Sequence, residues 1–163
     1  MHIHESAEDY LEAILRLREQ KGHVRSVDIA ALLGVSNLVM HYVEELDFVY
    51  RRIHKTLRPG GVFLMNIEHP TFTAGVNQQF STDGTWPVDN YYHPGLRQTD
   101  FLGHALTKYH HTLTQILNGL IQAGFSLEAV EEAVPPEEWR AFMPDEMRRP
   151  MMLLVKATKA TSN

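Results

Sequence analysis

Two short motifs carry side chains suited to acid–base chemistry or ligand binding. Glu68 and His69 directly follow the apolar run 62–67, and His110 follows Tyr109 later in the chain. An imidazole needs only a modest adjustment of its pKa to act as a general base near neutral pH. We therefore take His69 and His110 as the candidate catalytic residues.

The position of Glu68 and His69 favours a ligand-binding role. The run 62–67 predicts a strand covered on both faces, as in a parallel sheet. Proteins of the α/β class bind ligands at the C-terminal ends of such strands. The candidate substrate-binding residues are Glu68, His69, Tyr91, Arg97, Tyr109 and His110. An equally strong alternative is that the histidines and tyrosines only hold a long loop in place.

Periodicity and turn residues predict the elements that position these side chains. Apolar spacing and glycine stops predict helices at 47–57 and 112–123, and strands at 62–67, 126–134 and 151–157. Proline, glycine and aromatic residues between 70 and 100 indicate a long ordered loop or lid. For 104–110 the periodicity fits a strand or a helix. This order of elements is typical of part of an α/β domain.

The first 36 residues have a different character and predict two short helices. Ser6 and Ser26 are suited to cap them, and Gly34 is suited to the tight turn of a helix-turn-helix. The segment 36–46 then has the place of a DNA-recognition helix. Its outward side would present Asn37 and His41, which are the candidate DNA contacts.

The sequence does not favour a metal site. Asp9 and Glu12 are one helical turn apart, but exposed acids near a helix N-terminus are the better interpretation. The ten histidines include no His-x-x-x-His pair on a predicted helix.

Composition limits the class of protein. The chain has 163 residues, of which 44% are hydrophobic, and this indicates one domain or two small ones rather than disorder. It has no cysteine, no apolar stretch long enough for a membrane helix and no secretory signal, so we expect a cytoplasmic protein. The net charge of −5 does not favour DNA binding.

The N-terminal part resembles the iron- and manganese-dependent repressors related to diphtheria toxin repressor. The resemblance rests on the segments 6–14, 22–25 and 28–30. It implies that Asp9 and Glu12 match two metal ligands of the manganese-responsive members. In that family a recognition helix, a winged hairpin and a helical dimerisation domain follow, and no counterpart of the dimerisation domain follows here.

From Asn37 onward the chain is similar to the C-terminal half of class I S-adenosylmethionine-dependent methyltransferases. The matching strings, in the family's order, are 38–44, 53–61 with its Leu-Arg-Pro-Gly-Gly turn, 68–70, 109–113, 123–125 and 148–151. The resemblance implies a partial Rossmann-like sheet of about three strands with flanking helices, in which 62–67 is the fifth strand of the parent fold. It also implies S-adenosylmethionine as cofactor and a methyl acceptor near Glu68.

The cofactor-binding half of that family has no counterpart in the sequence. No Gly-x-Gly occurs anywhere, although a glycine-rich turn and an acidic residue hold the nucleoside in the family. We therefore expect a hybrid, with a helix-turn-helix-like segment at 1–36 and a methyltransferase-like part at 37–163, that is not catalytic as a lone chain. The alternatives are a metal-responsive DNA-binding regulator and an inactive folded chimera.

The missing strands also predict self-association. Without the fourth strand of the parent fold, residues 62–67 have an unpaired edge, which tends to pair with another chain. We expect a homo-oligomer through this edge. The alternative is that the N-terminal helices fold back over it.

Overall fold

The structure, a computed structural model, describes residues 35–75, 78–101 and 104–161. In chain order the elements are β1 (Val35–Asn37), the 3-10 helix η1 (Met40–Tyr42), α3 (Leu46–Thr56), β2 (Val62–Glu68), α4 (Pro70–Thr73), β3 (Gly95–Phe101), β4 (His104–His110), α5 (Leu113–Gln122), β5 (Phe125–Ala133), the 3-10 helix η2 (Glu137–Trp139) and β6 (Met152–Lys159). The fold is mixed α/β, as expected. None of the helices in these ranges is long and apolar enough to cross a membrane.

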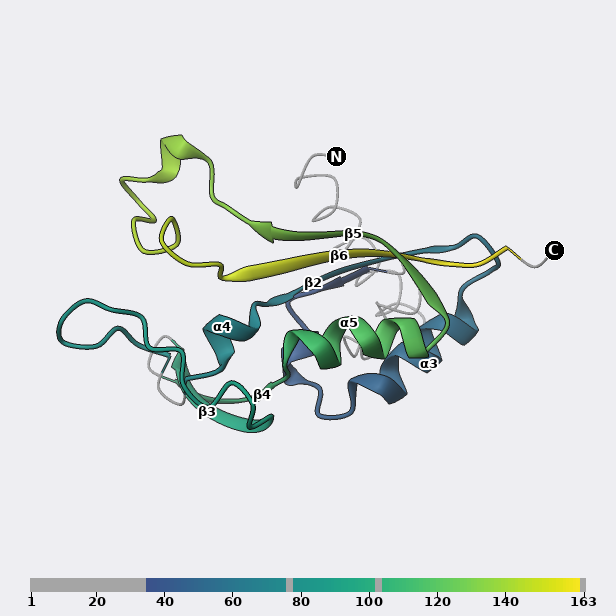
Figure 1. The fold of residues 1–163 in the computed structure, drawn as a ribbon, viewed down its shortest axis with the longest axis horizontal. Coiled ribbons are helices and arrows are strands. Elements are labelled where there is room, and N and C mark those ends of the chain that lie inside the picture. Colours follow the sequence, from purple (N-terminus) through teal and green to yellow (C-terminus); the bar gives the residue numbers. More distant parts are fainter. Residues whose placement is uncertain (1–34, 76–77, 102–103, 162–163) are drawn as a thin grey trace.

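Four strands form one sheet in the order β1-β2-β6-β5 (Figure 1). β1 runs parallel to β2, with Asn37 opposite Asn66. β6 is antiparallel to β2 and to β5, with Val155 opposite Met65. β2 therefore lies between a parallel strand and the C-terminal strand.

Two expectations about this sheet are wrong. It has four strands rather than about three, and β1 already occupies part of the edge of β2 that was expected to be open. β1 pairs with Leu64–Asn66 through backbone hydrogen bonds, which satisfy the polar groups of that edge. The unpaired edge on this side of the described sheet belongs to β1.

The predicted recognition helix at 36–46 is also wrong. The chain is extended through β1, and Leu38 then adopts a left-handed φ of 54° while its N–H donates to the carbonyl oxygen of Asn66 at 2.8 Å. The turn leads into η1, where Met40 is buried. The apolar residues of this segment are thus divided between a strand end, a short 3-10 helix and the start of α3.

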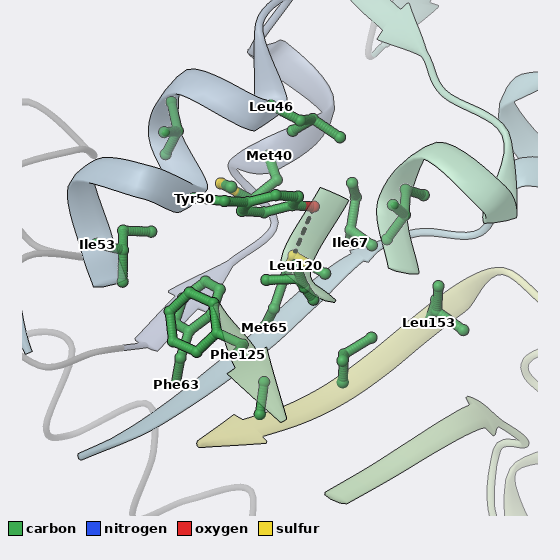
Figure 2. Close-up of a cluster of buried hydrophobic side chains, with 14 residues drawn as sticks. Met40, Leu46, Tyr50, Ile53, Phe63, Met65, Ile67, Leu120, Phe125 and Leu153 are labelled. Atoms are coloured by element: carbon green, nitrogen blue, oxygen red, sulfur yellow. Dashed lines mark hydrogen bonds between the residues drawn. The ribbon is translucent and has the colours of Figure 1, made fainter. Parts of the chain in front are cut away.

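The hydrophobic core lies between one face of the sheet and the helices α3 and α5 (Figure 2). Phe63, Met65 and Ile67 alternate along β2, so their side chains share the core face. On the opposite face Leu64 is half-buried. The described residues thus bury β2 fully on one face only, unlike the two-sided burial expected.

The two core helices follow their sequence signals closely. Helix α3 buries Leu46, Val49, Tyr50 and Ile53 at helical spacing. Helix α5 begins with a capping box, in which the Thr112 side chain accepts from the N–H of Gln115 and the Gln115 side chain accepts from the N–H of Thr112.

The hairpin β3–β4 is separate from the main sheet, with Gly95 opposite His110. The undecided segment 104–110 is therefore a strand. The loop expected over 70–100 begins with the short helix α4 and ends in β3, so its irregular part is shorter than expected. These elements place α4 and β4 beside the C-terminal end of β2.

Candidate functional site

Polar side chains converge where the parallel strands β1 and β2 end. His41 lies in η1 just after β1, Glu68 is the last residue of β2, and His69 caps α4. β4 contributes Lys108 and His110 from the adjoining hairpin. The candidate site is therefore built at the sheet edge where α/β folds bind ligands.

Glu68 and Lys108 form a buried ion pair. Lys108 Nζ lies 2.6 Å from Glu68 Oε1, and the two residues are 5% and 8% exposed, respectively. Glu68 Oε2 is buried and has no hydrogen-bond partner among the described residues. Burial raises the pKa of Glu68, while its hydrogen bond and charge interaction with Lys108 oppose that rise. The pair thus leaves one buried carboxylate oxygen with unused hydrogen-bonding capacity among the described residues.

His41 is a buried, neutral imidazole rather than an outward-facing side chain. It is 3% exposed, and burial together with the charge of Lys108 lowers its pKa to about 3. Its Nδ1 lies 3.5 Å from the N–H of Glu68. The expectation that His41 is exposed for DNA contact is therefore wrong, and Asn37 lies in β1 rather than in a helix.

His69 links the end of β2 to the edge strand β5. Its Nδ1 accepts from the N–H of Thr71 at 3.2 Å, so the ring proton is on Nε2, which lies 2.8 Å from Glu132 Oε1. Burial lowers the pKa of His69, and Glu132 opposes this shift. Both ring nitrogens already face groups of this chain, so the ring is oriented as a helix cap.

His110 is similarly engaged on both ring nitrogens. Nε2 lies 2.9 Å from the carbonyl oxygen of Tyr91, which can only accept, so Nε2 carries the proton and Nδ1 accepts from the Thr73 hydroxyl at 2.8 Å. The side chain is fully buried, and burial is the main cause of its lowered pKa. The lone pair that a general base would use is occupied.

Tyr91 and Arg97 hold the loop that precedes β3. The Tyr91 hydroxyl accepts from the N–H of Leu113 at 3.0 Å. Arg97 donates to four carbonyl oxygens, those of Ala74, Asn90, His93 and Leu96. Tyr109 is half-buried on β4. The structure thus brings Tyr91, Arg97 and His110 into one network that fixes the loop, while Glu68 and His69 have other partners.

Lys108 is the site residue that the sequence did not reveal. It is buried on β4, two residues before His110, and alternation along a strand places both side chains on one face. The spacing of Lys108 and His110 predicts a shared face only if residues 104–110 form a strand, and the sequence left that segment open between strand and helix.

The described residues do not include the glycine-rich turn after a parallel strand that holds the nucleoside of S-adenosylmethionine in the family. The described glycines with left-handed backbone are Gly60, Gly84, Gly95 and Gly124. None of these four follows the C-terminal end of a parallel strand. The described residues also contain no group of three potential metal ligands, and the candidate ligands Asp9 and Glu12 lie outside them.

Residues 2–38 match the family model of the iron dependent repressor N-terminal DNA binding domain. Over 132 residues the chain is 26% identical to an uncharacterized protein of Haemophilus influenzae, with 76% of this chain and 52% of that protein aligned. The chain therefore spans about half the length of this curated relative.

Two solved structures share more of the sequence. An S-adenosylmethionine dependent methyltransferase from Mesorhizobium loti is 38% identical with a TM-score of 0.69, and a Listeria monocytogenes protein assigned the same activity is 38% identical with a TM-score of 0.71. Each match covers 77% of this chain and 60% of the other. The chain thus joins a segment that matches a repressor DNA-binding domain to a body similar in structure to S-adenosylmethionine-dependent methyltransferases.

Proposed function

We propose that residues 37–163 form the acceptor-side half of an S-adenosylmethionine-dependent methyltransferase, and that one copy of the chain by itself does not transfer methyl groups. The observation that supports this most is the parallel pair β1–β2 ending at a buried polar cluster, in a sequence without Gly-x-Gly. The division at 36/37 falls inside β1, so the end of the front segment contributes backbone to the sheet.

Within this half-site, Glu68 is the residue that orients the acceptor. Its Oε1 is held by Lys108, whereas its buried Oε2 has no partner among the described residues. A buried acceptor without a partner is costly, and a hydroxyl or amine of a ligand would satisfy it. His69 and His110 support the site through their contacts with α4, β5 and the loop.

Calorimetric titration with S-adenosylmethionine and S-adenosylhomocysteine tests the proposal. The 163-residue chain should give no saturable heat at millimolar ligand, because the glycine-rich turn that admits the nucleoside is missing. The Mesorhizobium loti methyltransferase is the positive control. Saturable binding of one nucleoside per chain would overturn the proposal.

The match of residues 2–38 supports a second function, DNA binding by a regulator. The structure provides no recognition helix at 36–46, so the DNA contacts of such a regulator would have to come from other residues. A gel shift of duplex DNA at low salt, weakened by added salt, is the expected result for this function. If the chain binds neither the nucleosides nor DNA, the remaining hypothesis is an inactive folded chimera that self-associates.

A further inference from the structure

We propose that the cavity beside Arg149 binds the carboxylate of a small, planar organic acid. The inference rests on the proposed function. The cavity lies at the same edge of the sheet as Glu68, so its ligand would be the methyl acceptor, and the cavity indicates the chemical class of that acceptor. Arg149 and Pro150 lie just before β6, separated from it by one residue, and Met152 of β6 pairs with Glu68 at the end of β2.

The cavity has a volume of about 360 Å³ and is lined mainly by aromatic, arginine and small side chains. That volume is at the lower end of the range for small-molecule sites. Its lining includes Thr71, Phe80, Trp86, Val88, Arg148 and Arg149. The Trp86 indole donates to the carbonyl oxygen of Thr71 at 3.0 Å, so one wall is fixed by a hydrogen bond.

Arg149 is held as a flat cation over aromatic rings. Its guanidinium carbon lies 4.0 Å from the ring centroid of Trp86, 4.8 Å from that of Phe72 and 5.3 Å from that of Phe80. Phe72 and Trp86 are stacked with an interplanar angle of 4°. These rings therefore hold the guanidinium in place by cation–π contacts.

The cation lacks full hydrogen bonding within the chain. The Arg149 side chain is 10% exposed, and its Nε and Nη1 are buried without a partner among the described residues. Its nearest carboxylate, Glu146, lies 3.9 Å from Nη2, which is beyond hydrogen-bond range. Leaving buried donors unpaired is costly, so an entering acceptor would be favoured.

A carboxylate matches these donors better than a neutral group does. Arginine binds carboxylates through paired, charge-assisted hydrogen bonds, which Nη2 forms together with either Nε or Nη1. Arg149 itself lines the cavity, so a carboxylate that entered there would meet the guanidinium. Arg148 adds a second positive charge to the cavity lining. Its ion pair with Asp145 is long, with 3.7 Å between Nη1 and Oδ1, so this charge is only weakly paired.

Benzoate is the probe, with benzamide as its neutral counterpart of nearly the same shape. In a Trp139→Phe background, Trp86 is the remaining tryptophan, and its fluorescence reports on the cavity directly. At constant ionic strength, saturable quenching by millimolar benzoate is expected, with benzamide at least about tenfold weaker. Equal binding of the two ligands, or no saturation by benzoate, would overturn the proposal.

Two pairs of variants locate the site. Arg149→Gln should weaken benzoate binding at least about tenfold, while Arg140→Gln, at an exposed arginine outside the cavity, should not. Val88→Asp should weaken benzoate binding through charge repulsion. Val88→Asn introduces a neutral side chain of the same shape as aspartate and should not weaken it. Val88 is half-exposed, so this pair tests the proposal even if Arg149→Gln unfolds. Unchanged benzoate affinity in Val88→Asp would contradict it.

The test uses no methyl donor, so its outcome is separate from that of the nucleoside titration. Benzoate binding with no nucleoside binding supports both proposals. Benzoate binding together with nucleoside binding would overturn only the claim that a lone chain lacks the donor site.

Discussion

At the scale of single residues, the imidazoles of the site are neutral structural groups. His69 and His110 each direct both ring nitrogens at groups of this chain, and His41 is buried beside Lys108. Burial lowers the pKa of all three because it disfavours the charged ring. We therefore propose Glu68 as the ligand-binding residue at this edge, because its second oxygen has no partner among the described residues.

Stability should fall in mild acid, with His41 as one cause. The pKa of His41 is about 3 in the folded chain against 6.5 in a model peptide. Below pH 6.5 the unfolded chain takes up a proton that the folded chain does not, so stability declines as the pH falls towards 3. His41→Asn, which keeps an acceptor near the Nδ1 position, should remove roughly 2 kcal/mol of the loss between pH 7.5 and pH 5.

Urea unfolding at the two pH values measures this difference. His93→Asn is the control, because His93 is exposed. The interpretation fails if the pH dependence of His41→Asn equals that of the unaltered chain.

Removing Lys108 should expose the cost of burying Glu68. Lys108→Met leaves the carboxylate buried without its partner, and we expect a loss of about 3 kcal/mol in the free energy of unfolding near pH 8. The loss should shrink at pH 5, because losing Lys108 raises the pKa of Glu68 further and protonation then removes the buried charge. Adding Glu68→Leu should restore most of the stability.

Denaturant curves of the two variants measure the effect. Arg140→Met, which breaks an exposed ion pair with Glu137, is the matched control and should have little effect. A double variant no more stable than Lys108→Met alone would contradict this account of the pair.

At the scale of elements, the helices α3 and α5 are positioned by a close contact at Gly119. A Cβ atom placed there would lie 2.7 Å from Asp47 Oδ1 and 3.1 Å from the Tyr50 ring. Tyr50 is fully buried and its hydroxyl lies 3.5 Å from the sulfur of Met65, so the ring has little room to move. The glycine allows α5 to approach α3 closely.

Gly119→Ala should therefore destabilise the fold. In an open helix, alanine would add about 1 kcal/mol of stability, but here overpacking costs typically 1–3 kcal/mol, so we expect a small net loss. Thermal unfolding measures it, with Asn118→Ala as the control on the exposed side of the same helix. A higher melting temperature for Gly119→Ala would show that the contact is not restrictive.

At the scale of the whole molecule, the outer edge of β1 is the expected place of self-association. The N–H of Leu38 points to β2, so alternation along the strand directs the N–H of Asn37 away from it. Among the described strands β1 is the outermost on this side, and a sheet edge without a partner favours pairing with a second chain. We propose a homodimer formed through this edge.

Light scattering at about 100 µM should detect the dimer, because a stable interface of standard size persists at that concentration. Asn37→Pro removes an outward donor and should shift the chain towards monomer. A monomeric unaltered chain would contradict the proposal.

The sequence by itself determined the elements whose signals are local. The stripe of α3, the capping residue Thr112, the apolar alternation of β2 and the final strands depend on neighbours a few residues away, and these elements were predicted within a residue or two. The same local information placed Glu68 and His69 at the end of a strand.

Tertiary structure decided whatever depends on partners distant in the chain. β1 is a strand because β2 supplies hydrogen bonds to it, although its surroundings suggested a helix. Lys108 faces Glu68 across 40 positions of sequence, and His110 faces Thr73 across 37. Burial and pairing set the protonation of these side chains, and neither can be read from spacing, so only the folded chain shows which polar groups remain available to a ligand.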